Sequence, residues 1–419
     1  MSASDVAIVA ALVFAWGTLS ARLERFDVTA PIIFVAAGVL LTHGPLAPLG
    51  FTPSRGLVKT LAEVTLVLLL FSDASRVGLR DLRAEIGLCA RMLGVGLPLT
   101  IVLGTLLAVG LFAGMNIWLA LLVGAALAPT DAALGAAVMV NPAVPARIRR
   151  LLNVESGLND GIATPIVLIA VAGAGTAEHA ASSGPGAAAA ELALGVLAGA
   201  IVGGLGGLIV NAARRKGWAA SEFAGSAVLA LAFCAYACAL AVHGNGFIAA
   251  FVGGLAYGAA GGQRGERLVP YVEETGALVS LLVWLAFGAV AVVPAIQGLT
   301  WQTALYAVLS LTLIRMFPVA LALLGSGLGR TAVAFVGWFG PRGLASVVFA
   351  LLALEDLGGP ARAAVSVIAC TVLLSVIAHG LTADPLARRY GPRLDLPAGG
   401  PDDAGIPQVP VRRLIRRAS

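Results

Sequence analysis

The sequence predicts an all-α polytopic membrane protein of about 13 transmembrane helices, arranged as two inverted six-helix repeats. Of its 419 residues, 59% are hydrophobic and only 12% are charged, whereas soluble domains carry about 25% charged residues. Apolar runs of about 20 residues, long enough to cross a bilayer, recur along the whole chain. Two of these runs, seven apart in chain order, are interrupted by proline and glycine. The 52 glycines and the low aromatic content of 6% favour packed helices over a membrane barrel.

The apolar runs give the predicted spans in order. The first run is interpreted as a retained membrane helix and not as a cleaved signal peptide, because no basic segment precedes it. The predicted spans are 4–20, 30–46, 58–75, 90–112, 116–140, 151–173, 188–211, 221–242, 246–262, 275–293, 302–324, 331–354 and 362–381. Residues 1–390 therefore form the membrane domain. Residues 391–419 form a short basic tail that is either disordered or lies on the anionic membrane surface.

The basic residues provide an independent test of these spans, because cytoplasmic loops hold most Lys and Arg residues. With the N-terminus outside, 22 of the 27 basic residues fall in inner loops or the tail, and the outer loops hold only Arg55, Lys59 and Arg362. One of these inner loops holds Arg147, Arg149 and Arg150. We therefore expect a multi-pass protein of the inner (plasma) membrane with a cytoplasmic C-terminus. Residues 174–190 are predicted to be a flexible outer loop.

Nothing in the sequence indicates ATP use or a bound metal cluster. There is no P-loop, and the four histidines are scattered. Cys234 and Cys238 are one helical turn apart, which could be half of a metal site, but small residues in a packed helix are the simpler interpretation. We expect no enzyme activity, no cofactor, no catalytic residue and no nucleic-acid partner.

The two interrupted spans place charges where lipid should be. In APTDAALG, Pro129 breaks the fifth span and is followed by Thr130 and Asp131; in GWFGPRGLAS, Pro341 and Arg342 lie at the break of the twelfth. Irregular backbone survives at that depth only where it is buried in protein or lines a cavity. Paired interruptions in inverted repeats indicate a midplane site, where charges of both signs balance the ends of the half-helices. Pro129 alone could be a simple kink.

The sixth span begins with NVESGLNDGIATP. Asp160, beside Asn159 and one turn after Ser156, offers oxygen ligands for a small cation. Glu155 points in another direction, and Arg315 is its one available partner besides the arginine at the break, so we predict a buried pair. Alternatively, Glu155 lies at the wet cytoplasmic rim.

Asp73, in LVLLLFSDAS, is the remaining ionisable candidate. It lies at the cytoplasmic end of the third predicted span, near Arg76. It is either an interfacial aspartate or part of an ion path, and the sequence leaves both open.

Together, TD at one break, ESGLND on the next span and GPRG at the second break resemble the NhaP-like branch of the monovalent cation/proton antiporters, which includes the animal sodium/proton exchangers. Residues 244–258 and 371–389 extend the resemblance, which covers roughly residues 5 to 390. It implies the antiporter fold with crossed discontinuous helices. It also implies a homodimer whose rigid dimerisation domain supports a mobile core domain that moves like an elevator.

The resemblance further implies a role for each candidate residue. Asp160 would bind the cation or the proton, and Asn159 would be the partner that marks this branch. Accessory ligands or site organisers would be Thr130, Asp131, Ser156 and Asp73. The structural ion pair would be Glu155 with Arg315, and the crossing-helix charge would be Arg342.

The expected activity is exchange of Na⁺ or Li⁺ for H⁺ across the lipid bilayer. Because residue 159 is asparagine and not a second aspartate, one proton per cation and no net charge are expected. A K⁺/H⁺ antiporter of the same fold is the alternative. A channel would need a filter-like loop, which we do not find. A hydrolase would need a base for Ser156, but its helix has no histidine, and His243 and His379 lie near span ends.

Overall fold

The computed structural model describes residues 3–23, 28–51, 53–76, 87–139, 141–178 and 185–390. Within these ranges the regular structure is entirely helical, which confirms the predicted fold class. Eight of the described helices are long and apolar enough to cross a membrane, and three shorter apolar helices accompany them. The count of thirteen spans stays a prediction. The predicted tail, 391–419, lies outside the described residues.

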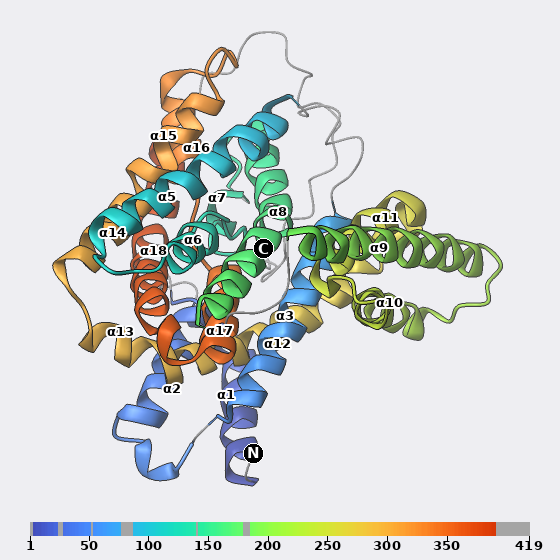
Figure 1. Ribbon diagram of the computed structural model, residues 1–419. Helices are drawn as coiled ribbons and strands as arrows, with labels where there is room; N and C mark the ends of the chain where they lie inside the picture. The colour runs from blue at the N-terminus through green and yellow to red at the C-terminus, as the bar shows by residue number, and fades with distance from the viewer. Residues whose placement is uncertain are drawn as a thin grey trace.

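The helices run in the following order (Figure 1). The first part of the chain forms α1 (Ala3–Leu23), α2 (Ala30–His43), η2 (Ala47–Leu49), α3 (Arg55–Ser75), η3 (Met92–Gly96), α5 (Leu97–Leu111), α6 (Ile117–Ala126), α7 (Ala136–Met139) and α8 (Ala146–Glu178). The middle forms α9 (Pro185–Arg215), α10 (Ser221–Ala241), α11 (Gly246–Glu266), α12 (Val269–Phe287), η4 (Gly288–Val292) and α13 (Val293–Gln297). The last part forms α14 (Trp301–Leu311), α15 (Leu313–Ala322), α16 (Arg330–Trp338), α17 (Leu344–Leu357), η5 (Gly359–Ala361) and α18 (Arg362–Tyr390).

Polar caps set several helix starts. The side chain of Asn116 accepts from the Trp118 amide at 2.9 Å at the start of α6. Asn245 accepts from the Ile248 amide at 3.1 Å at the start of α11. Each of these asparagines satisfies an amide that has no partner inside its own helix. An apolar helix thus begins at a defined residue after a short loop.

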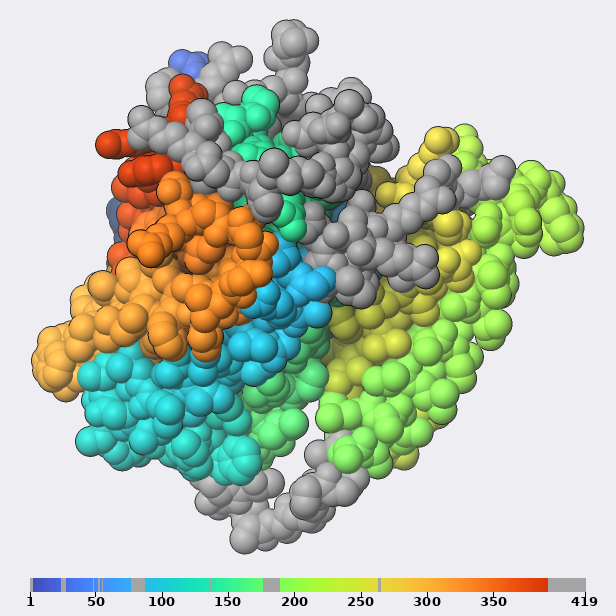
Figure 2. Space-filling view, turned by 90° about the horizontal axis from the view of Figure 1, so that it is seen from above, coloured from blue at the N-terminus to red at the C-terminus, as the bar shows by residue number. Residues whose placement is uncertain are grey.

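Glycines bring α9, α11 and α3 into backbone contact. A Cβ on Gly203 of α9 would overlap the carbonyl oxygen of Gly253 of α11, and a Cβ on Gly254 would overlap the carbonyl of Phe71 of α3. Small residues at helix contacts allow this close approach in membrane proteins. Helices α9, α10 and α11 lie on one side of the molecule, and α5, α14, α15 and α16 lie on the other (Figures 1 and 2).

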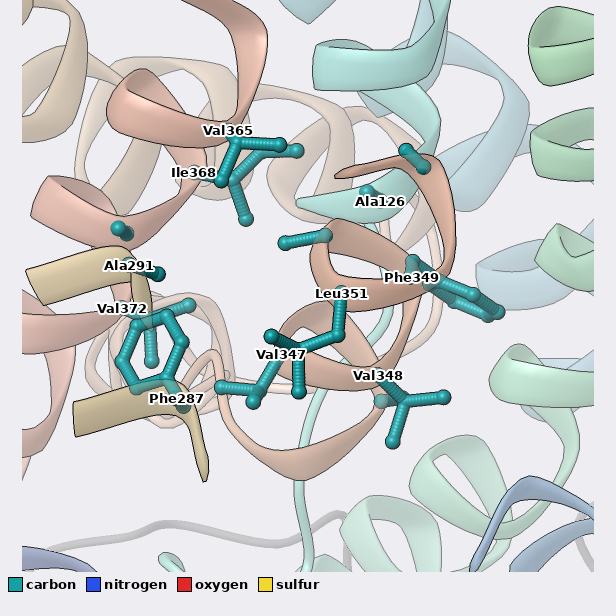
Figure 3. Close-up of a cluster of buried hydrophobic side chains, with 14 of the residues drawn as sticks. Ala126, Phe287, Ala291, Val347, Val348, Phe349, Leu351, Val365, Ile368 and Val372 are labelled. Carbon is teal, nitrogen blue, oxygen red and sulfur yellow. The ribbon is translucent and has the colours of Figure 1, made fainter. Parts of the chain in front are cut away.

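Helix α17 is enclosed by protein along its first ten residues. Each residue from Leu344 to Ala353 is buried. Side chains such as Val347 and Leu351 pack against Phe287 at the end of α12 and against Ile368 of α18 (Figure 3). A helix that is apolar all round can face lipid or protein, and the burial of these residues shows that here it faces protein. The helix that follows the second break is therefore held on every side by protein.

Some predicted boundaries differ from the structure. Helix α8 begins at Ala146 and ends at Glu178, so it extends the predicted span 151–173 in both directions. As a result Arg147 and Arg150 lie in helix and not in a loop, and much of the predicted loop 174–190 is helical. Hydropathy locates only the apolar part of a helix, and a helix continues into water as long as its backbone bonds persist.

Candidate functional site

The two interrupted helices cross at their unwound segments. Helix α6 ends at Ala126, and the chain stays non-helical until α7; helix α16 ends at Trp338, and α17 starts at Leu344. The two unwound segments are joined where the Asp131 amide donates to the Pro341 carbonyl at 2.8 Å. Residues far apart in sequence thus meet through their backbones at one point.

Arg342 satisfies the end of the opposite half-helix. Its Nη1 donates to the carbonyls of Ala128 at 2.7 Å and Pro129 at 3.1 Å, directly after α6. The Ser346 hydroxyl donates to the carbonyl of Ala126 at 2.6 Å. Arg342 is fully buried, with 0% of its surface exposed. A cation is favourable at this position because the carboxyl end of a helix carries partial negative charge.

Asp131 does the reverse for α17. Its Oδ2 accepts from the Leu344 amide at 2.8 Å, and its Oδ1 accepts from the Ala133 amide at 2.7 Å. A Cβ at Gly343 would overlap the Asp131 carboxylate, so glycine is needed there. The carboxylate thus caps a helix start, where negative charge is stabilised. Each break therefore caps the half-helix of the other.

A buried polar cluster adjoins this crossing. The Thr130 hydroxyl lies 2.9 Å from the Ser156 hydroxyl and accepts from Asn159 Nδ2 at 2.7 Å. These three residues are 2%, 6% and 1% exposed, respectively. Within the described part of the chain, the Asn159 Oδ1 atom is buried and has no hydrogen-bond partner. A buried amide oxygen without a partner is costly, so it needs a ligand or a functional explanation.

Asp160 follows on the same helix and is 5% exposed. Its carbonyl accepts from the Thr164 hydroxyl at 2.6 Å, one turn later. On either side of it, Gly161 faces the ring of Phe251 on α11, and a Cβ at Gly157 would lie 3.6 Å from the Asp73 carbonyl oxygen on α3. This turn of α8 thus runs along α3 and α11.

Glu155 and Arg315 form a buried ion pair between α8 and α15. Arg315 donates from Nη1 to Oε1 at 2.5 Å and from Nη2 to Oε2 at 2.9 Å. The two residues are 3% and 2% exposed. A fork-to-fork pair of this kind fixes both position and orientation. The pair also adjoins the second break, because a Cβ on Gly340 would come 2.5 Å from Arg315 Nε.

Asp73 lies on α3, the helix that runs beside the Asp160 turn of α8. It is half-buried in the last turn of α3. Its neighbour Arg76 forms an ion pair with Glu273 of α12. The structure thus brings the backbone of Asp73 to α8 and gives Arg76 an acidic partner on another helix.

The described residues contain no group of three His, Cys, Asp or Glu side chains that could hold a metal ion. Cys234 and Cys238 are exposed on α10, with their sulfur atoms 3.8 Å apart. The buried side chains of Thr130, Ser156, Asn159 and Asp160 carry oxygen atoms that could contact a cation near the crossing.

Sequence reasoning missed two residues that contact the second break. Ser375 accepts from the Arg342 amide at 2.7 Å, and His379 lies 2.9 Å from the Trp338 carbonyl. Both are on α18 and buried. Their four-residue spacing inside an apolar span was the available signal, because two polar residues on one face of a membrane helix mark a packed surface.

Comparison with known proteins gives consistent results. The transmembrane sodium/hydrogen exchanger family matches residues 8–389. Two curated relatives, the uncharacterized Na⁺/H⁺ exchangers Mb2309 of Mycobacterium bovis and Rv2287 of Mycobacterium tuberculosis, are each 33% identical over 257 residues, which is 60% of this chain. The match spans 43% of the length of those relatives.

Two solved structures of the sodium proton antiporter MjNhaP1 from Methanocaldococcus jannaschii share the fold. The structure at pH 8 superposes with a TM-score of 0.73 at 18% identity, covering 92% of this chain and 98% of that one. The electron-microscopy structure gives a TM-score of 0.70 at 17% identity, covering 94% and 98%. At this identity the likeness concerns the fold.

Proposed function

The chain belongs to the sodium/hydrogen exchanger family, and from that premise we propose that it exchanges a monovalent cation for a proton at a site centred on Asp160. The observation that carries the proposal is the Asn159 amide oxygen, which is buried without a partner. It lies beside an acidic residue that is 5% exposed. The proposed cargo is Na⁺, with Li⁺ as a second substrate and K⁺ as the alternative.

The proposed ligands are all oxygens, the donor type that suits hard cations. Asp160 supplies the charge and Asn159 the amide oxygen. The Thr130 and Ser156 hydroxyls, which hydrogen-bond to one another, complete the set or orient it. Asp131 is a site organiser in this scheme, because both of its carboxylate oxygens already cap backbone amides.

Competition for one carboxylate accounts for exchange. A bare charge is expensive inside a membrane, so Asp160 crosses the barrier only when a cation or a proton neutralises it. Asn159 has no charge of its own to neutralise. One proton therefore moves for each cation, and the cycle moves no net charge. An imposed membrane voltage should leave the rate of exchange unchanged in sealed vesicles.

For alternating access we propose that α8 and the crossed breaks move as a mobile core against a rigid slab formed by α3, α9 and α11. The glycine contacts favour rigidity in that slab, because the backbones touch. We propose that two copies associate through the rigid part, that the protein resides in the plasma membrane, and that its C-terminus is cytoplasmic.

The test is proton movement in everted vesicles, followed with a pH-sensitive dye after Na⁺, Li⁺ or K⁺ is added. We expect a cation to dissipate the proton gradient with wild type and to have no effect with Asp160→Asn. The order of the ions gives the selectivity. Absence of a response to every ion from correctly folded wild type, between about pH 6 and about pH 9, would refute the proposal. A cation current without proton movement would indicate a channel.

A further inference from the structure

One turn of α18 holds both sides of the second break. On the α16 side, His379 Nε2 lies 2.9 Å from the Trp338 carbonyl oxygen. On the α17 side, the Arg342 amide donates to the Ser375 hydroxyl at 2.7 Å. The two contacts are linked, because the Ser375 hydroxyl lies 3.1 Å from His379 Nδ1. The unwound residues 339–343 are thus spanned by a short hydrogen-bonded chain.

The hydrogen-bond partners restrict the protonation states that suit the imidazole. The Trp338 carbonyl can only accept, so Nε2 of His379 must donate. The Ser375 oxygen already accepts from Arg342, so its own hydrogen is free to be donated to Nδ1. A neutral histidine with its proton on Nε2 satisfies the contacts with the Trp338 carbonyl and with the Ser375 hydroxyl. Protonated Nδ1 could instead donate to the Ser375 carbonyl, 3.0 Å away, and the hydroxyl would lose its acceptor.

The packing around the histidine holds it in this position. His379 is 1% exposed. The Trp338 ring lies over it, with 5.2 Å between ring centroids and 30° between planes. The indole nitrogen of Trp338 donates to the Thr382 hydroxyl at 3.1 Å, which ties the same residue to α18 a second time. The end of α16 is therefore held both by its backbone and by its side chain.

We propose that His379 is a positioning residue for ion exchange. As a neutral imidazole it fixes residues 339–343 and, through Ser375, the backbone from which Arg342 reaches the end of α6. The proposal rests on the proposed exchange function, and His379 itself does not contact the ion site in this scheme. Loss of His379 should therefore lower the turnover of transport and leave the affinity for the cation nearly unchanged.

The charges near His379 predict a dependence on pH. Arg342 and Arg315 are the charged groups whose fields reach it. The described residues of α6, α13 and α14, which also pack against α18, include no acidic or basic side chain. Glu355 and Asp356 of α17 lie in its last turn, away from the break, and Asp384 of α18 pairs with Arg388. Protonation of His379 would add a positive charge beside two arginines and turn Nδ1 from an acceptor of the Ser375 hydroxyl into a donor. Exchange should therefore fall in acid in a way that requires this histidine.

The test compares His379→Leu, which removes both contacts, with His379→Gln. The glutamine amide can still donate to the Trp338 carbonyl and does not titrate. In proteoliposomes we expect turnover about tenfold lower for the leucine variant, with the cation KM nearly unchanged. The glutamine variant should keep most of the wild-type turnover, and its turnover should fall less in acid than that of wild type. Equal turnover for all three proteins, or equal loss in both variants, would overturn the proposal.

A measurement without transport separates this inference from the proposed function. Hydrogen–deuterium exchange of the purified protein reports the amides of 338–344 directly. In these amides we expect hydrogen–deuterium exchange about tenfold faster for His379→Leu and for Ser375→Ala, which removes one hydroxyl. The amides of α9 should exchange at the wild-type rate in both variants. If the wild-type protein transports no ion, the proposed antiport activity is refuted. The hydrogen–deuterium exchange rates still decide whether His379 positions the break. Unchanged amides in the Ser375→Ala protein would refute the link through the hydroxyl.

Discussion

Replacing Glu155 with leucine should destabilise the fold strongly, because it strands a buried cation. Arg315 is 2% exposed and donates to both oxygens of the Glu155 carboxylate, at 2.5 and 2.9 Å. Leucine fills most of the space but accepts no hydrogen bond. The guanidinium of Arg315 would then remain among apolar helices beside another buried arginine, Arg342.

The size of the effect follows from this geometry. Removing one member of a buried, hydrogen-bonded ion pair costs about 3–5 kcal/mol. With a melting temperature that moves by about 2 °C per kcal/mol in a chain of this size, we expect a fall of about 6–10 °C. The matched control is Asp384→Leu, which removes the exposed partner of Arg388, a pair whose side chains are 38% and 70% exposed. That loss should cost less than about 1 kcal/mol.

The assay is thermal unfolding in detergent, followed by the fluorescence of the 6 tryptophans. The double variant Glu155→Leu/Arg315→Leu removes both charges and should recover most of the lost melting temperature, since a buried pair contributes little over an apolar replacement. A single variant as stable as wild type would refute the reasoning. So would a double variant that melts no higher than the single one.

Three further predictions concern the site and the scaffold. Thr130→Val should raise the cation KM several-fold in a flux assay, because it breaks the link between Ser156 and Asn159; Thr130→Ser should not, and equal KM values would count against the ligand set. Gly203→Ala should lower thermal stability by about 1–3 kcal/mol, because its Cβ meets a neighbouring backbone, whereas Gly204→Ala, with no atom within 4 Å, should be neutral or stabilising; similar melting curves would contradict this. Asp131→Ala should lower the free energy of unfolding by about 1–2 kcal/mol in the same assay, because the helix cap is lost, and Asp131→Asn should lower it less. Two variants as stable as wild type would show that the cap does not stabilise the fold.

Local patterns in the sequence were sufficient for much of the architecture. Apolar runs predict helices because the membrane as a solvent requires them. The orientation that the basic residues predict stays a prediction. Pro129 and Pro341 marked the breaks because proline cannot complete a helix backbone. The pairing of Glu155 with Arg315 followed from charge accounting: few cations were available inside the spans, and a buried carboxylate needs one.

Other features depend on which surfaces meet in three dimensions. The π-helical turns Met92–Gly96 and Gly288–Val292 have no local signature, because packing decides where one extra residue is accommodated. Asp131 was expected as a ligand or an organiser, and its contact with the Leu344 amide, which supports the second role, depends on a segment 213 residues away. His379 was set aside because it lies near a predicted span end, although in the folded chain it touches the middle of another interrupted helix.

The reciprocal caps at the crossing also have a consequence for biosynthesis. Arg342 donates to the Ala128 carbonyl, although the two residues are 214 positions apart in the chain. A ribosome adds about 5–20 residues per second, so Arg342 is synthesised roughly 10–40 seconds after the first break. During that interval the carbonyls of Ala128 and Pro129 lack Arg342, and Oδ2 of Asp131 lacks the Leu344 amide. The core therefore cannot mature helix by helix as it is inserted, and it closes only after the second half of the chain has entered the bilayer.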